Sequence, residues 1–328
     1  MLSHSDVKSP SRALRQLPIV ETLDQRQLFS LAGIPVTVYP IPQGTNFPGN
    51  LTVTANGNVW YTSALASEVG YVSPDGTVAP PISTASASSH GLDGMTVGKD
   101  GNVWFCEFWD NVIGEIKPDG QVLTYALPKK FGPESITLGP DGHLWITTFN
   151  NIVGRINSVG AGKAKVSWFI HKGEGVKQIV SWNNSLFIQE SDAIGRESRT
   201  GAFNGTFKMP HGGTVADLTV GPDGNLWFTE NGKSGSTSDF VGYINKKGKI
   251  VEYAVSNALG SLAGISRAGN GNLVFCQGEY LEEITTTGDI VASQDLGLAS
   301  GASSVAMGTD GNVWFAEGVT GKIGVATV

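Results

Sequence analysis

The stretch PDGNLWFTE at residues 222–230 decides how the rest of the chain is interpreted, because close copies of it recur along the sequence. The other copies are ANGNVWYTS (55–63), KDGNVWFCE (99–107), PDGHLWITT (140–148), WNNSLFIQE (182–190), GNGNLVFCQ (269–277) and TDGNVWFAE (309–317). The position of Trp227 therefore recurs at intervals of 40 to 47 residues. A period of this length indicates a repeat architecture.

Each repeat reads as four short strands. In the unit around Trp227, an apolar run (217–221) leads into an Asp-Gly turn, which supplies the positive φ angles of a tight hairpin, and the strand LWFTE follows. A third strand (241–245) and a fourth (249–256) come after further turns. Four-stranded units at this spacing describe the blades of a β-propeller. The sequence predicts an all-β fold, a seven-bladed β-propeller of four-stranded antiparallel blades, over residues 34–328.

The two ends of the repeat array predict how the ring closes. The seventh unit stops at Val328, after its third strand, and residues 34–42 (IPVTVYPIP) have the fourth-strand pattern ahead of the first unit. An open array would expose two unpaired strand edges, which soluble proteins avoid. We therefore expect the N-terminal strand in 34–42 to complete the last blade.

Composition excludes several classes of protein. Lys and Arg number 22 against 29 Asp and Glu, a net charge of −7, which argues against a nucleic-acid partner. The 44 glycines among 328 residues indicate a turn-rich chain. No run approaches the roughly 18 apolar residues that a membrane span needs. We expect a monomer that binds a small molecule, a glycan or a protein at one propeller face.

Residues 1–33 lie outside the repeats, and we expect a flexible N-terminal segment there. Within it, VETLDQRQLFSLAG (20–33), with Leu23, Arg26 and Leu28, resembles a short motif found near the start of many exported bacterial surface proteins. This resemblance implies an extracellular or cell-surface location.

Acidic side chains converge on one face of the predicted propeller. The second strands end in Glu107, Glu190, Glu230 and Glu317 at equivalent positions. Clustered carboxylates raise one another's pKa unless a cation offsets them, so Glu107, Glu230 and Glu317 are candidate ligands for Mg²⁺ or another divalent cation. The alternative is structural, with each glutamate accepting backbone N–H bonds between blades.

Further candidates lie on the same face, most of them in the loops that enter the first, inner strand of each blade. His90 and His211 are candidate catalytic residues, because their glycine neighbours let a ligand approach the backbone, although lone loop histidines are usually solvated. The candidate ligand-binding residues are Asp93, Trp109, Glu134, His171 and Glu190. Trp109 stands where other units have small or polar residues, which fits an exposed aromatic platform or packing between blades.

The repeat pattern, with PDGN-LWFTE followed by an IGRI-like strand, resembles that of the streptogramin B lyases, also called virginiamycin B lyases. The resemblance covers residues 34–328 and implies a seven-bladed propeller. It also implies a Mg²⁺-dependent carbon–oxygen lyase that linearises a cyclic depsipeptide antibiotic by elimination, without water. In that family, histidines lie two residues before the apolar residue of the inner strand. The corresponding residues here are Gly49, Asp93, Glu134, Lys177, Ala216, Ala263 and Ser303, and none is histidine.

These residues support two main hypotheses about function. The first is an exported propeller that binds a ligand or partner at its acidic rim, the face that carries Glu107, Glu190, Glu230 and Glu317. The second is a lyase of the family's type that uses His90 or His211 as a displaced base beside rim carboxylates. A third, a Ca²⁺-dependent sugar-lactone hydrolase, requires a converging Glu, Asn and Asp set that these repeats do not supply.

Overall fold

The structure is a computed structural model that describes residues 32–42, 47–63, 65–84 and 91–328. The chain divides into two units, Met1–Ser30 and Leu31–Val328, and the first lies outside the described residues. The predictions for residues 1–31 and for His90 therefore also lie outside them.

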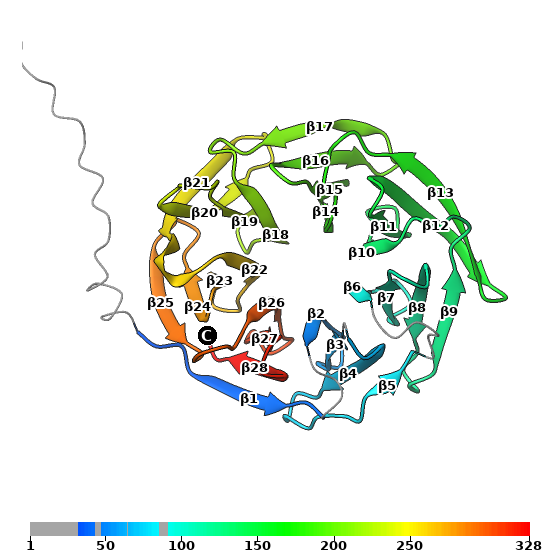
Figure 1. Ribbon diagram of the computed structural model, residues 1–328, viewed down its shortest axis with the longest axis horizontal. Coiled ribbons are helices and arrows are strands. Elements are labelled where there is room, and N and C mark those ends of the chain that lie inside the picture. The colour runs from blue at the N-terminus through cyan, green and yellow to red at the C-terminus, as the bar shows by residue number, and fades with distance from the viewer. Residues whose placement is uncertain (1–31, 43–46, 64, 85–90) are drawn as a thin grey trace, which may run out of the picture. The chain divides into compact units, whose positions relative to one another are not determined.

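Within the second unit, strands form sheets arranged around a common centre (Figure 1). The four-stranded sheets comprise β2 (Pro48–Val53), β3 (Val59–Ser63), β4 (Glu68–Val72) and β5 (Ile82–Ser83); β14 (Ile179–Trp182), β15 (Ser185–Gln189), β16 (Ala193–Ser198) and β17 (Phe203–Lys208); β18 (Thr214–Val220), β19 (Leu226–Asn231), β20 (Ser238–Ile244) and β21 (Ile250–Ser256); β22 (Leu262–Arg267), β23 (Leu273–Gln277), β24 (Tyr280–Ile284) and β25 (Ile290–Asp295); and β26 (Ala302–Met307), β27 (Val313–Glu317) and β28 (Lys322–Ala326) with β1 (Val36–Pro40). In Figure 1 the first strand of each repeat lies nearest the centre and the fourth lies outermost.

The number of separate sheets differs from the prediction of seven. Five sheets have four strands, and one has eight, made of β6 (Leu92–Val97), β7 (Val103–Glu107), β8 (Val112–Ile116), β9 (Val122–Ala126), β10 (Pro133–Leu138), β11 (Leu144–Thr148), β12 (Ile152–Gly160) and β13 (Lys163–Ile170). The long outer hairpin β12–β13 reaches β9, where Ala126 donates its N–H to the carbonyl of Gly162 at 2.9 Å. This contact merges two repeats into one sheet.

The N-terminal strand closes the last sheet, as predicted. Strand β1 pairs antiparallel with β28, from Val36 opposite Ala326 to Pro40 opposite Lys322. The flanking Ile34 and Ile41 are buried. The ends of the described chain are thereby joined in one sheet, and β28 has no open edge.

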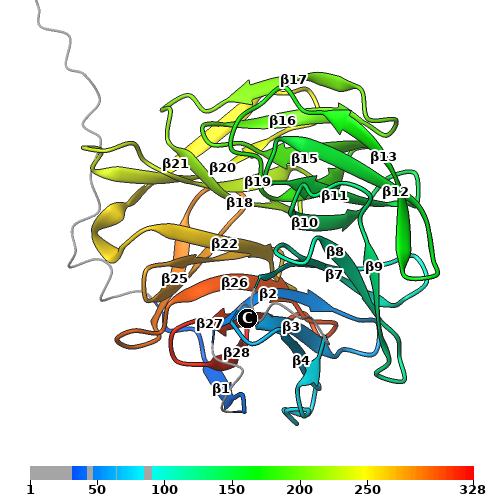
Figure 2. The ribbon, with the colours of Figure 1, turned by 45° about the vertical axis from the view of Figure 1, so that its right-hand side comes forward.

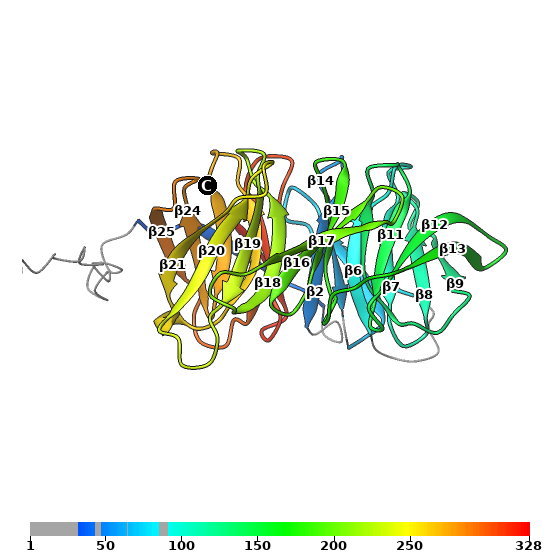
Figure 3. The ribbon, with the colours of Figure 1, turned by 90° about the horizontal axis from the view of Figure 1, so that it is seen from above.

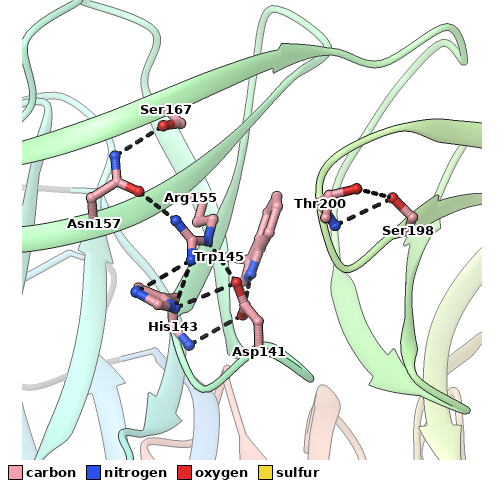
Figure 4. A network of polar contacts seen from close by, with 8 residues as sticks. All are labelled: Asp141, His143, Trp145, Arg155, Asn157, Ser167, Ser198 and Thr200. Carbon is pink, nitrogen blue, oxygen red and sulfur yellow. Dashed lines mark hydrogen bonds and ion pairs between the residues drawn. The ribbon is translucent and has the colours of Figure 1, made fainter.

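The tight turns explain why Asp, Gly and Trp recur together. In the turn before β19, Gly224 has a φ of 73°, and the Asp223 carboxylate accepts the Asn225 backbone N–H at 3.1 Å and the Trp227 indole N–H at 2.9 Å. Asp141 does the same for Trp145 at 2.9 Å and also binds Arg155, as Figure 4 shows. These aspartates therefore serve turn geometry.

The hydrophobic core lies between neighbouring sheets. One cluster joins Trp182, Phe187 and Ile194 of one sheet to Leu218 and Phe228 of the next. The strands run across the thickness of the unit, and loops connect them at both faces (Figures 2 and 3). Such packing fixes the inner strands relative to one another and so fixes the surface they present to the centre.

The described residues hold one helix, the single turn η1 (Asn257–Leu259). Its length is far below what crossing a bilayer requires, and no membrane-spanning helix is found in this part of the chain.

Candidate functional site

The inner strands enclose a central cavity of about 990 Å³. Its charged and amide-bearing lining residues are Asn50, Asp93, Glu134, Lys177, Gln178, Gln189, Asp217, Asn231 and Arg267. Hydroxyl groups from Thr52, Thr96, Thr137, Thr219 and Ser266 line it as well. A polar interior of this size, built by rigid strands, lies within the range of small-molecule sites.

Three charged residues lie at the starts of successive inner strands. Asp93 belongs to β6, Glu134 to β10, and Lys177 precedes β14 by two residues. All three line the cavity, and all three occupy the position at which the resemblance places family histidines. The structure thus brings together two of the predicted ligand-binding residues, Asp93 and Glu134. It adds Lys177, to which the sequence pattern assigned no role.

The surroundings of Asp93 favour its protonated form. Burial raises its pKa to about 7, with the negative charge of Glu134 contributing, while a hydrogen bond from Asn50 and the charge of Lys177 oppose the shift. Asn50 donates through Nδ2 to Asp93 Oδ1 at 3.0 Å. A carboxyl group that titrates near neutral pH inside a cavity can both give and accept a proton.

Glu134 and Lys177 complete the charged end of the cavity. Burial raises the pKa of Glu134, and the Lys177 charge partly offsets this effect. Glu134 Oε2 is buried and has no hydrogen-bond partner among the described residues. The backbone of Lys177 is held on both sides, since its N–H donates to the Gln189 carbonyl at 3.0 Å and its carbonyl accepts from the Thr147 hydroxyl. The ammonium therefore projects from a fixed backbone.

Polar side chains also tie neighbouring inner strands together. Gln178 bonds the backbone of Leu218 through both its amide atoms, at 2.7 and 3.2 Å. Asp217 accepts the backbone N–H of Ile265 at 2.7 Å, and burial raises its pKa to about 6. Asp217 is thus engaged in holding strands, which leaves Asp93 and Glu134 as the carboxyl groups available to a ligand.

The second-strand glutamates are arranged differently. None of Glu107, Glu190, Glu230 and Glu317 is among the described residues that line the cavity, and all four are buried. Glu230 Oε1 accepts the N–H of Gly213 at 2.6 Å, while Glu317 accepts the Thr320 hydroxyl and lies 3.5 Å from Lys322 Nζ. At these two positions the glutamates hold the loops of their own sheets.

His171 and Glu190 come together away from the cavity lining. The imidazole is buried, with Nε2 at 2.9 Å from Glu190 Oε1 and Nδ1 at 3.0 Å from Glu197 Oε1. Burial alone would lower the pKa of His171, but the hydrogen bonds and charges of the two glutamates outweigh it and raise the pKa to about 9. His171 is therefore a cation that anchors the loop leading to Lys177.

His211 lies in the equivalent loop of the next repeat but is half exposed. Its Nδ1 is 2.7 Å from Glu252 Oε2, and its ring stacks on Phe240 with centroids 4.0 Å apart. Burial, and then Glu252, raise the pKa of Glu230 to about 7, and burial raises that of Glu252. His211 is not among the described residues that line the cavity.

The family resemblance implies Mg²⁺, but the charged residues of the described chain do not fit a dedicated site for it. Within the described ranges, no group of three or more His, Cys, Asp or Glu side chains is arranged to hold a metal ion. At the cavity, the positive charge of Lys177 acts on the Asp93 and Glu134 carboxyls and opposes the binding of a cation there. The cavity carboxyls are therefore better suited to the donor groups of an organic ligand.

Trp109 is 68% exposed and lines a separate groove together with Phe108 and Phe149. Sequence reasoning missed Glu197, which pairs with His171, and Glu252, which pairs with His211. They lie within strands, at positions where other repeats have different residues, so no repeat pattern could have identified them.

These features define a β-propeller with a polar central cavity, and a family model places it more narrowly. The model for the virginiamycin B lyase family matches residues 31–164 and 129–328. The chain therefore belongs to the virginiamycin B lyase family.

Solved structures agree with this assignment. A catalytically inactive histidine-to-alanine variant of virginiamycin B lyase from Staphylococcus aureus, with quinupristin, is 25% identical with a TM-score of 0.79, over 90% of this chain and 99% of that one. A streptogramin B lyase is 24% identical with a TM-score of 0.78, over 90% and 97%. Hydrazine synthase of Kuenenia stuttgartiensis, at 13% identity, a TM-score of 0.74 and 88% and 97% coverage, shares the fold alone. No curated protein matches the chain.

Proposed function

We propose that the protein binds a small polar molecule in the central cavity, with Asp93, Glu134 and Lys177 as its anchors. The observation that carries this proposal is the placement of three charged groups at successive strand starts, facing one cavity of about 990 Å³. The second-strand glutamates and His171 have structural parts in this proposal, as supports for the loops at the cavity mouth.

The charges at the cavity indicate what the ligand carries. Withdrawing charged groups from water is costly unless hydrogen bonds replace the lost hydration. A ligand that covers Asp93 and Glu134 must therefore present donors such as amine, amide or hydroxyl groups. A carbonyl or carboxylate oxygen of the same ligand would face Lys177. An apolar molecule would offer no hydrogen bond to any of these three groups.

A second candidate function is an elimination of the family's type in the same cavity. Family membership favours it, and so does the pKa of Asp93 near 7, because a base that titrates near neutral pH suits proton transfer. In such a step, Asp93 in its ionised form would remove a C–H proton, the electron pair of that C–H bond would form a new C=C bond, and the electron pair of the ester C–O bond would leave on the carboxylate. The inactivity of the Staphylococcus aureus histidine-to-alanine variant indicates that a histidine is needed in that relative.

The decisive experiment separates binding from chemistry. Binding of quinupristin is measured by calorimetry for the wild type and for Glu134→Gln and Lys177→Ala, and the incubated ligand is examined by mass spectrometry with Mg²⁺ and with EDTA. If the variants bind quinupristin more weakly than the wild type and mass spectrometry finds the ligand intact, the result supports binding alone. A ring-opened product of unchanged mass supports elimination, and a gain of one water indicates hydrolysis.

The ligand itself is to be sought more widely. A thermal-shift screen with amino acids, short peptides, sugar acids and cyclic peptides is run against the wild type, with Glu134→Gln and Lys177→Ala as controls. Compounds that raise the melting temperature of the wild type but not of these variants occupy the cavity. Stabilisation that persists in both variants counts against the proposed anchors.

We also propose that the eight-stranded sheet acts as two blades, because its halves β6–β9 and β10–β13 meet through the single parallel pair Lys163 and Ala126. The unit then has seven blades, and we expect light scattering to show a monomer.

We propose that the protein is exported, as the 20–33 motif implies. Cell fractionation of the full chain tests this, and a wholly cytoplasmic product would refute it.

A further inference from the structure

A groove of about 390 Å³ lies outside the central cavity, between the loop that joins β7 to β8 and the segments flanking β10 and β11. The groove is lined by Phe108, Trp109, Asp110, Asn111, Lys130, Phe131, Gly132, Phe149 and Asn150. Its volume is at the lower end of the range of about 300–1,000 Å³ for small-molecule sites. The proposed function makes no use of it.

Aromatic rings form the apolar part of this groove. Trp109 and Phe149 are 68% and 67% exposed, which is unusual for side chains of this size. Phe108 stands between them, nearly perpendicular to each, at centroid distances of 4.7 Å to Trp109 and 5.9 Å to Phe149. A ring cluster that remains open to solvent is available to a ligand.

The rings are carried on a fixed backbone. The N–H of Phe108 donates to Gly91 at 2.8 Å, and the N–H of Phe149 donates to Gly132 at 3.1 Å. Asn111 accepts the backbone N–H groups of Phe131 at 3.0 Å and of Gly132 at 3.3 Å, so it joins the two sides of the groove. A pre-organised arrangement of this kind lowers the entropic cost of binding.

The polar groups of the groove decide between ligand classes. Lys130 and Asp110 contribute one positive and one negative charge, and Asn150 adds an exposed amide. A cation over the rings would meet the repulsion of Lys130, although aromatic faces otherwise attract cations. A purely apolar partner would offer no hydrogen bonds to the Lys130 ammonium or to the Asn150 amide. The lining residues of the groove carry one charge of each sign, which suits an uncharged ligand that has both apolar and hydrogen-bonding surface.

We propose that this groove binds a neutral sugar ring of a glycan. A pyranose has a face of C–H groups that packs against an aromatic ring, and its hydroxyls both donate and accept hydrogen bonds. Trp109 and Phe149 would take the C–H faces, and Asp110, Lys130 and Asn150 would bind the hydroxyls. The site is separate from the central cavity and does not depend on what that cavity binds.

The test uses the full chain and three neutral probes, chitotetraose, cellotetraose and maltotetraose, by calorimetry and by quenching of tryptophan fluorescence. We expect at least one probe to bind saturably, with affinity reduced at least about tenfold by Trp109→Ala and by Phe149→Ala. Trp109→Phe keeps a ring and should retain most of the affinity. Leu298→Ala is the matched control, since Leu298 is 92% exposed and lies outside the groove.

Several outcomes would overturn the proposal. It fails if none of the three probes binds, or if the Trp109→Ala and Phe149→Ala variants bind as the wild type does. Preferential binding of tetramethylammonium would assign the groove to cations, and co-sedimentation with phosphatidylcholine vesicles that Trp109→Ala abolishes would assign it to a lipid surface. Circular dichroism of each variant separates loss of binding from loss of fold.

Discussion

His171 and Glu190 form a buried ion pair, with 2.9 Å between His171 Nε2 and Glu190 Oε1. The spacing between them in the sequence, 19 residues, recurs between His211 and Glu230 of the next repeat. There, however, the imidazole pairs with Glu252 and is half exposed. The same sequence spacing therefore produces a sealed cation in one repeat and a solvent-facing histidine beside two carboxyls in the other.

The first prediction concerns His171→Gln. His171, Glu190 and Glu197 form a buried charged cluster. Its contribution to stability is fully present below the ordinary histidine pKa of 6.5 and is lost as the pH rises through about 9, because the folded state raises the pKa of His171. Removing the cation leaves Glu190 and Glu197 buried together, a change that costs roughly 3–5 kcal/mol. Urea unfolding at pH 6 and pH 10 measures it.

The variant should therefore be much less stable than the wild type at pH 6, and the gap should narrow at pH 10. His211→Gln is the control, because its half-exposed ring should contribute far less to the free energy of unfolding. An equal loss at both pH values would show that His171 acts through packing and not through its charge.

A second prediction contrasts two equivalent glutamates. Burial, and then Glu252, raise the pKa of Glu230 to about 7 from an ordinary 4.5, so the wild type loses stability as the pH rises through this window. Glu230→Gln keeps an acceptor for the Gly213 N–H and should be about 1–2 kcal/mol more stable than the wild type at pH 8, with no gain at pH 4.

Glu190→Gln, at the same position of the preceding repeat, should do the opposite. It removes a carboxylate from the His171 imidazolium, and at pH 8 it should destabilise the fold. Thermal melts of both variants at pH 4 and pH 8 test the pair. A common sign at pH 8 would contradict the assigned environments.

A third prediction concerns ring closure. Deleting residues 34–42 removes strand β1 and the buried side chains of Ile34 and Ile41, and leaves β28 with an unpaired edge. Loss of one buried isoleucine side chain costs about 2–5 kcal/mol, and an open apolar edge invites association. The deletion should lower the melting temperature and give aggregates by light scattering, whereas an unchanged melting temperature would show that closure contributes nothing.

Much of the fold could be predicted from the repeat. The Asp-Gly turn, the tryptophan and the glycine of the third strand have local reasons, since Asp223 binds the Trp227 indole and a Cβ on Gly114 would collide with the Phe105 ring. The joining of two repeats into one sheet was not predictable in this way. It depends on the length of the outer hairpin β12–β13, and the spacing between repeats already varies by as many residues as such a hairpin needs.

The site was harder to predict, because strand alternation does not say which side chain remains free. Glu107, Glu230 and Asp93 are all carboxylates near one edge of the sheets, yet only Asp93 lines the cavity. The difference arises because the first strand faces the centre while the second lies one strand further out. Partners such as Glu197 and Glu252 come from other strands, and their contacts depend on tertiary packing.

The last prediction concerns Asp93, where one substitution should increase stability and weaken ligand binding. Burial, and then the charge of Glu134, raise its pKa to about 7 from an ordinary 3.8, so the wild type loses stability as the pH rises between these values. Asp93→Asn keeps an acceptor for Asn50 and removes the buried charge. It should be about 1–2 kcal/mol more stable than the wild type at pH 8, and equally stable at pH 4.

The same variant should bind a cavity ligand at least about tenfold more weakly at pH 8, because the anchor for the ligand's donor groups is gone. Melting curves at both pH values and calorimetry with a compound from the thermal-shift screen measure the two effects on one preparation. Gain of stability with loss of binding identifies a charge that is retained for function at a cost to the fold. If Asp93→Asn instead loses stability at pH 8, Asp93 is a strand tie like Asp217, and Glu134 and Lys177 remain the anchors to test.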